Sequence, residues 1–107
     1  MTEPLTREGI VEALRKEMPY LRERYGVEAI AIYGSFAKGT QHQASDVDVL
    51  VQLAKPLGLE FVSLALYLEE LLGRKVDLAT FESLRRSMET HRRREMAEDI
   101  LQTLSYV

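Results

Sequence analysis

Apolar residues recur along this chain at two different spacings, and the change between them predicts the order of helices and strands. From Thr6 to about Tyr25 they lie three or four positions apart, as on one face of a helix, at Ile10, Leu14, Met18 and Leu21. Thr6 is a suitable N-terminal cap for this helix, and Gly26 is a suitable stop. The run 27–33, rich in branched and aromatic residues, predicts a short strand that ends directly on Gly34.

The middle of the chain repeats this change of spacing. Residues 46–53 predict a second strand, which Pro56 and Gly58 bring to an end. A second helix follows, with Gly73 as its C-terminal cap and one apolar face formed by Phe61, Leu64, Ala65, Leu68, Leu71 and Leu72. Residues 76–78 predict a short third strand.

The last segment, from Phe81 to Val107, has a helical composition and a less regular pattern. Thr80 could cap its start, and a break is expected between Arg85 and Arg94, where the apolar spacing is lost. An apolar stripe returns at Met96, Ile100, Leu101 and Leu104. The order helix, strand, loop, strand, helix, strand, helix predicts a small α+β (or α/β) domain, with a short mixed sheet flanked by helices.

Length and composition limit what kind of protein this is. A chain of 107 residues predicts one domain, residues 1–107, with a core that needs no disulfide. Fourteen basic and 17 acidic residues give a net charge of -3, which argues against broad binding to nucleic acid or to a membrane surface. There is no cysteine, no apolar run of membrane-spanning length and no signal-peptide pattern, so a cytoplasmic location is predicted.

Two carboxylates stand inside the second predicted strand. Residues two apart on a strand share a face, so Asp46 and Asp48 should project together, while Val47, Val49 and Val51 point the other way. Such a pair is costly to bury unless a cation lies between the charges, and Mg²⁺ prefers carboxylate oxygens. An isolated Asp-x-Asp is more often a surface pair or a turn. If the third strand pairs beside the second, Asp77 joins the two and makes a metal site the better interpretation.

A small-residue turn precedes the carboxylates. Gly34 and Ser35 follow a predicted strand, and backbone amides at such a junction can hold a phosphate, with the serine hydroxyl as a further donor. Gly-Ser by itself is usually a simple turn between strands. Gly34 and Gly39 have the glycine spacing of a P-loop, but Thr40 stands where that motif needs lysine, which excludes it.

Three motifs follow one another in the sequence: Gly34-Ser35-Phe36-Ala37-Lys38-Gly39, Ser45-Asp46-Val47-Asp48-Val49-Leu50-Val51 and Val76-Asp77-Leu78. Together they resemble the signature of the polymerase-β-like nucleotidyltransferase superfamily, and more narrowly the minimal nucleotidyltransferases, or MNT proteins. The match runs from about Ile30 to Leu78. It departs from the family at Lys38, where arginine is usual; lysine keeps the charge but loses bidentate phosphate recognition.

The resemblance implies a polymerase-β-like nucleotidyltransferase fold and a set of roles for the site. Asp46, Asp48 and Asp77 would be the catalytic carboxylates and would bind Mg²⁺, with two ions expected, while Gly34 and Ser35 would bind the nucleotide triphosphate. An acceptor hydroxyl would attack the α-phosphate of ATP, and pyrophosphate would leave. Asp77 could also accept the proton of that hydroxyl.

Minimal nucleotidyltransferases similar to this chain are commonly encoded beside a HEPN-domain protein, and the two form a toxin–antitoxin pair. The resemblance implies that this chain is the antitoxin, which transfers AMP from ATP to a tyrosine of the HEPN ribonuclease toxin. Two alternatives stay open: a non-catalytic antitoxin that occludes its partner, and nucleotidyl transfer to a small molecule such as an aminoglycoside. Self-association is also open, while neither a membrane nor a nucleic acid is an expected partner.

Three further features have a simpler interpretation than a functional one. His42 is best interpreted as a solvated loop residue. The run 91–94, His-Arg-Arg-Arg, is surrounded by acidic residues and fits a solvated helix face. Tyr106 could stack on a base or pack against the first helix, and the sequence does not choose between them.

Overall fold

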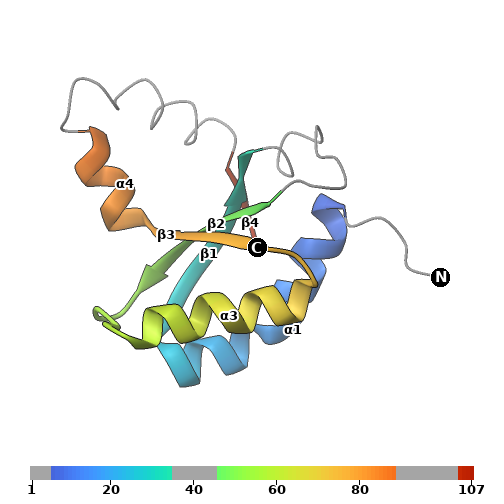
Figure 1. The fold of residues 1–107 in the computed structure, drawn as a ribbon, viewed down its shortest axis with the longest axis horizontal. Helices are drawn as coiled ribbons and strands as arrows, with labels where there is room; N and C mark the ends of the chain where they lie inside the picture. The colour runs from blue at the N-terminus through green and yellow to red at the C-terminus, as the bar shows by residue number, and fades with distance from the viewer. Residues whose placement is uncertain (1–5, 35–45, 89–103) are drawn as a thin grey trace.

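The computed structural model describes residues 6–34, 46–88 and 104–107 of the chain (Figure 1). Its elements follow the predicted order, with one additional short strand at the end. They are α1 (Arg7–Tyr25), β1 (Val27–Tyr33), β2 (Val47–Leu53), α3 (Glu60–Leu72), β3 (Val76–Thr80), α4 (Phe81–Met88) and β4 (Ser105–Tyr106).

The four strands form one mixed sheet in the order β3-β2-β1-β4. Strand β1 runs antiparallel to both of its neighbours, β2 and β4, whereas β2 and β3 are parallel. The parallel pair requires a crossover, and α3 provides it. The predicted short mixed sheet flanked by helices is therefore confirmed.

Helices α1 and α3 lie side by side and cover one face of the sheet (Figure 1). The core between them is apolar, and its sheet side includes Ile30 and Ile32 of β1 and Val47, Val49 and Val51 of β2. An ion pair of 3.0 Å between Arg24 and Glu60 joins the two helices at their exposed edge. The valines of β2 thus point toward the helices, as the alternation in the sequence predicted.

The opposite face of the sheet carries a smaller apolar cluster. Leu50 of β2 and Leu84 of α4 are buried there, and four partly buried residues pack against them: Tyr33, Ala79, Phe81 and Leu104. Helix α4 packs against β2 and β3 on this side. Because side chains alternate along a strand, this is also the face onto which Asp48 and Asp77 project.

The predicted helix ends are confirmed by the caps. The Thr6 hydroxyl oxygen accepts a hydrogen bond of 3.1 Å from the amide of Gly9, and Gly26 ends α1 in the left-handed conformation. Gly73 ends α3 in the same way, with a φ of 67°. At the start of α4, the Thr80 hydroxyl oxygen accepts a 3.0 Å hydrogen bond from the amide of Ser83.

The prediction of a helical segment over 81–107, with a break between Arg85 and Arg94, is wrong at its C-terminal end. Ser105 and Tyr106 form β4, which pairs with Ile32 and Ala31 at the free edge of β1, and the amide of Val107 donates to the carbonyl of Ile30 at 3.0 Å. A two-residue strand has no periodicity to detect, and its partner lies more than 70 positions away in the sequence. The chain is still helical at Met88, and the rest of the region of the expected break lies outside the described residues, as do Met96, Ile100 and Leu101 of the apolar stripe and the basic run 91–94.

Candidate active site

The strand pairing places three polar side chains in one row across the sheet. Asp48 of β2 lies opposite Asp77 of the parallel strand β3 and opposite Tyr33 of the antiparallel strand β1. The row therefore reads Asp77, Asp48, Tyr33, on the face turned away from α1 and α3. We call it the carboxylate row. The structure thus brings Asp48 and Asp77 together as the sequence predicted, although their chemical roles stay predictions.

Gly34 follows this row directly and closes the end of β1. Its φ of 73° lies in the left-handed region. A Cβ atom built on Gly34 would lie 2.2 Å from Oδ2 and 3.2 Å from Cγ of Asp48. The carboxylate of Asp48 therefore occupies the space that any side chain at position 34 would need. Only glycine allows the backbone of the turn and the carboxylate to approach so closely.

Burial and like charge act together on Asp48. Its pKa is raised from 3.8 to about 6, first by burial, then by the charge of Asp77 and then by that of Asp46. The pKa of the Tyr33 phenol is raised to about 12 by burial and by the charges of Asp48 and Asp77. This corner of the sheet therefore concentrates negative charge, as a cation site does before its ion binds.

The predicted metal ligands are arranged unequally. Asp48 and Asp77 are neighbours in register, whereas Asp46 is exposed and precedes the first residue of β2. Across residues 6–34, 46–88 and 104–107, no three His, Cys, Asp or Glu side chains form a group that could hold a metal ion as they stand. The positions of Asp48 and Asp77 therefore support their prediction as metal ligands. The position of Asp46, outside the strand, supports its prediction less.

Tyr33 is the member of the row that sequence reasoning missed. The sequence places it at the end of the predicted strand 27–33, and its position immediately before Gly34 carries no functional signal by itself. The signal becomes visible only when the antiparallel pairing of β1 and β2 sets Tyr33 opposite Asp48. Ser35, the second predicted nucleotide-binding residue, lies outside the described residues, as do Lys38 and His42.

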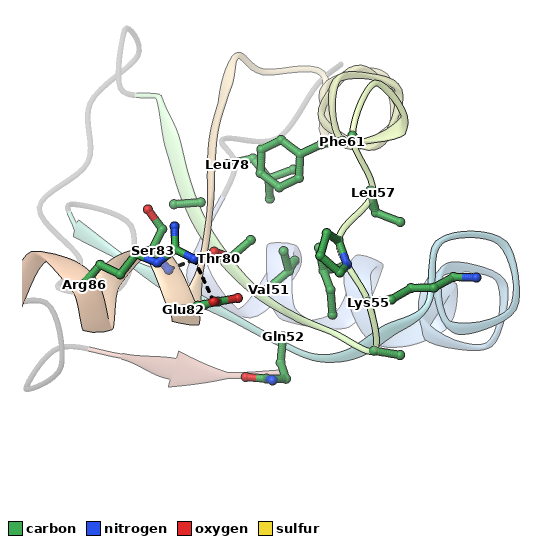
Figure 2. Close-up of a pocket in the computed structure, with 15 residues that line it drawn as sticks. Val51, Gln52, Lys55, Leu57, Phe61, Leu78, Thr80, Glu82, Ser83 and Arg86 are labelled. Atoms are coloured by element: carbon green, nitrogen blue, oxygen red, sulfur yellow. Dashed lines mark hydrogen bonds and ion pairs between the residues drawn. The ribbon is translucent and has the colours of Figure 1, made fainter.

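A separate cavity of about 630 Å³ lies at the other end of β2 (Figure 2). In Figure 2, Phe61, Leu57 and Leu78 line one side, and Glu82 and Arg86 of α4, joined by a 2.9 Å ion pair, line another. Gln52, which also lines it, is four residues beyond Asp48, or about 13 Å along the strand. This cavity is therefore distinct from the carboxylate row.

Comparison with known proteins agrees with this geometry. The family model described as the nucleotidyltransferase domain matches residues 14–102. The chain belongs to the nucleotidyltransferase domain family. The predicted family and fold are thus confirmed, and the chain is a nucleotidyltransferase, as expected. The match covers α3, the whole carboxylate row and Gly34.

Individual relatives of this nucleotidyltransferase make the similarity more specific. The protein adenylyltransferase MntA of Thermococcus cleftensis is 44% identical over 82 residues, which are 76% of this chain and 83% of that protein. A solved minimal nucleotidyltransferase structure has a TM-score of 0.68 at 26% identity, over 97% of this chain and 98% of the other. A toxin–antitoxin structure with AMP-PNP has a TM-score of 0.61 at 25% identity, over 95% of this chain and 72% of the other.

Within the part of the chain that the structure describes, no helix of this nucleotidyltransferase has both the length and the apolar character needed to cross a membrane.

Proposed function

We propose that this nucleotidyltransferase is an antitoxin that transfers AMP from ATP to a hydroxyl of its protein partner, a tyrosine of a HEPN-domain ribonuclease toxin. The carboxylate row beside Gly34 is the observation that supports the reaction. A relative 44% identical to this chain is named a protein adenylyltransferase, and a structural relative is a toxin–antitoxin complex with AMP-PNP. These two similarities support the adenylyl donor and the kind of acceptor.

The position and exposure of each site residue indicate its role in the proposed transfer reaction. Gly34, with Ser35 after it, would hold the triphosphate at the end of β1, where the glycine backbone can approach a phosphate closely. Asp77 is exposed, so it can reach an acceptor hydroxyl and take its proton as the oxygen attacks the α-phosphate. Asp48 is half-buried beside it and would be held less accessible to the acceptor.

The three predicted metal-binding carboxylates fit a hard divalent cation. Asp46, Asp48 and Asp77 offer only carboxylate oxygens, which Mg²⁺ prefers. The pKa of Asp48 is raised first by burial and then by the charges of Asp77 and Asp46, and a bound cation would offset both. We propose that these three residues hold Mg²⁺, with Asp48 and Asp77 contributing most because they lie in register. When bound, the ion would stabilise the negative charge that develops on the transferring phosphate.

A direct experiment tests the proposal. The purified protein is incubated with ATP, Mg²⁺ and the HEPN protein encoded beside it, and the intact mass of that partner is measured. We expect one or more added AMP groups on a tyrosine, and none when ATP or Mg²⁺ is left out. A bound but unmodified partner would contradict the transfer reaction.

The pH dependence of Mg²⁺ binding gives an independent prediction. Because the pKa of Asp48 is raised to about 6, a proton competes with the metal below that pH. We expect the Mg²⁺ affinity, measured by calorimetric titration, to be constant above about pH 7 and to fall by at most about tenfold for each unit below pH 6. An affinity that does not change between about pH 5 and 7 would show that Asp48 is not a ligand.

A second candidate function is supported by α3. Val62 and Leu66 of α3, together with Leu59 immediately before it, are 58%, 59% and 90% exposed. Apolar side chains gathered on one helix face are typical of protein-binding surfaces. The chain could therefore neutralise its partner by occlusion alone. Replacing Asp46 and Asp48 by asparagine distinguishes the two: neutralisation that survives the double substitution favours occlusion, and its loss with binding intact favours AMP transfer.

A further inference from the structure

Two aromatic side chains meet above the middle of the sheet, on the face that carries the carboxylate row. Phe81, at the start of α4, and Tyr106, in β4, have parallel rings, with 6.0 Å between centroids and 5° between planes. They come from elements at opposite edges of the sheet, since β3 leads into α4 and β4 is the other edge strand. We call this pair the aromatic ledge.

The sheet beneath the ledge has small side chains on two of its strands, at Ala79 of the edge strand β3 and at Ala31 of the central strand β1. Ala79, Leu50, Ala31 and Tyr106 lie opposite one another across the four strands. The alanines leave room above the sheet into which the two rings can lean toward each other. Tyr106 remains 63% exposed, so one side of its ring is covered by Phe81 and much of the rest is free.

The ledge lies next to the carboxylate row. Leu50 is two residues beyond Asp48, and Ala31 is two residues before Tyr33, so the two rows are neighbours on the same face, about 7 Å apart along the strands. Gly34 lies on the opposite side of the carboxylate row from the ledge. Tyr106 lies two strands across the sheet from Asp48, or roughly 10 Å in that direction, so the ribose and base of a nucleotide whose α-phosphate lies at Asp48 would cross β1 to reach its ring.

We propose that the aromatic ledge is the base-binding part of the nucleotide site, with the base stacked on the exposed side of the Tyr106 ring. This inference rests on the proposed function, because it assumes that a nucleoside triphosphate binds along Gly34 and Asp48. Stacking on a tyrosine ring needs only the π face of the base, and every base has one. The ledge therefore adds affinity for the nucleoside without selecting strongly among purines.

The test separates the base from the phosphates. Binding of AMP-PNP and of inorganic tripolyphosphate, both with Mg²⁺, is measured calorimetrically for the wild-type protein and for variants at position 106. We expect Tyr106→Ala and Tyr106→Leu to weaken AMP-PNP binding by about 5- to 100-fold and to leave tripolyphosphate binding unchanged. Tyr106→Phe, which keeps the ring, should bind both ligands as the wild type does.

A tyrosine elsewhere serves as the matched control. Tyr20 of α1 is 44% exposed and packs its ring on other tyrosines, at 5.1 Å from Tyr67. Tyr20→Ala should change neither affinity. The proposed base-binding role of the ledge is wrong if Tyr106→Ala binds AMP-PNP as tightly as the wild type. It is also wrong if the variant loses affinity for AMP-PNP and for tripolyphosphate equally. If the wild-type protein binds neither ligand, the proposed function is wrong, and so is the base-binding role of the ledge that rests on it.

Discussion

Asp48→Asn is expected to reduce AMP transfer strongly and, at the same time, to make the fold more stable at about pH 7.5. Activity should fall by roughly 100- to 1000-fold, because the variant loses a carboxylate that we propose holds the Mg²⁺, and the bound ion would stabilise the charge on the transferring phosphate. The stability change has the opposite direction. The pKa of Asp48 is about 6 in the folded protein against 3.8 ordinarily, so the folded state loses stability as pH rises from about 4 to 6.

An asparagine at position 48 has no charge to bury, so the stability of the variant does not fall as pH rises from about 4 to 6. Asp48 is only partly buried and solvent screens its neighbours, so we expect a gain of about 1 kcal/mol rather than the full value of the shift, or about 4 °C in melting temperature. The gain should vanish at about pH 3 and below, where Asp48 is largely protonated in both the folded and the unfolded state. All melts are run without divalent metal, because a bound cation would stabilise the wild-type protein alone.

Glu28→Gln is the matched control for Asp48→Asn. Glu28 is an exposed carboxylate of β1 that lies outside the carboxylate row, so its replacement by an amide should alter neither transfer nor melting. A variant Asp48→Asn that still transfers AMP, or that melts below the wild type at about pH 7.5, would contradict the role given to Asp48.

Gly34→Ala is expected to displace the Asp48 carboxylate and so to eliminate both transfer and Mg²⁺ binding. A Cβ at 2.2 Å from Oδ2 is far inside van der Waals contact, and the Asp48 side chain is the part that can move. Because that side chain can rotate away, the fold should survive, with a loss in stability of about 1–3 kcal/mol from the left-handed backbone and the crowding. Chemical denaturation measures the stability, and calorimetry measures the metal affinity.

The chain contains two controls that separate these causes. Gly58 and Gly73 also have positive φ, 59° and 67°, but a Cβ at either would meet nothing within 4 Å. Gly58→Ala and Gly73→Ala should therefore lose stability from the backbone alone and keep Mg²⁺ binding. If Gly34→Ala binds Mg²⁺ as tightly as these two variants, the close approach of Gly34 to the Asp48 carboxylate is not needed for Mg²⁺ binding.

The part of the site that could be predicted is the part that a strand encodes locally. Alternation within β2 determines that the valines face one way and Asp48 the other, whatever the partner strands are. The caps Thr6, Gly26 and Gly73 were similarly visible, since each satisfies or ends a helix through its own chemistry.

The rest depends on pairings between distant segments. Tyr33 became part of the row only through its register with Asp48, and Tyr106 met Phe81 only because β4 adds to the free edge of β1. Neither contact leaves a periodic trace in the sequence, because each involves one residue from each of two strands or helices. Composition predicted helix near Tyr106, and edge pairing with β1 prevailed there.

The alternation of β2 also has a consequence for how this protein can change over time. A one-residue insertion or deletion inside β2 would turn Asp48 toward the helices and a valine toward the substrate. Such an indel would therefore destroy the core and the site in the same event. The same alternation in β2 therefore orients both the core valines and Asp48, so a shift of one residue cannot change one set of side chains and spare the other.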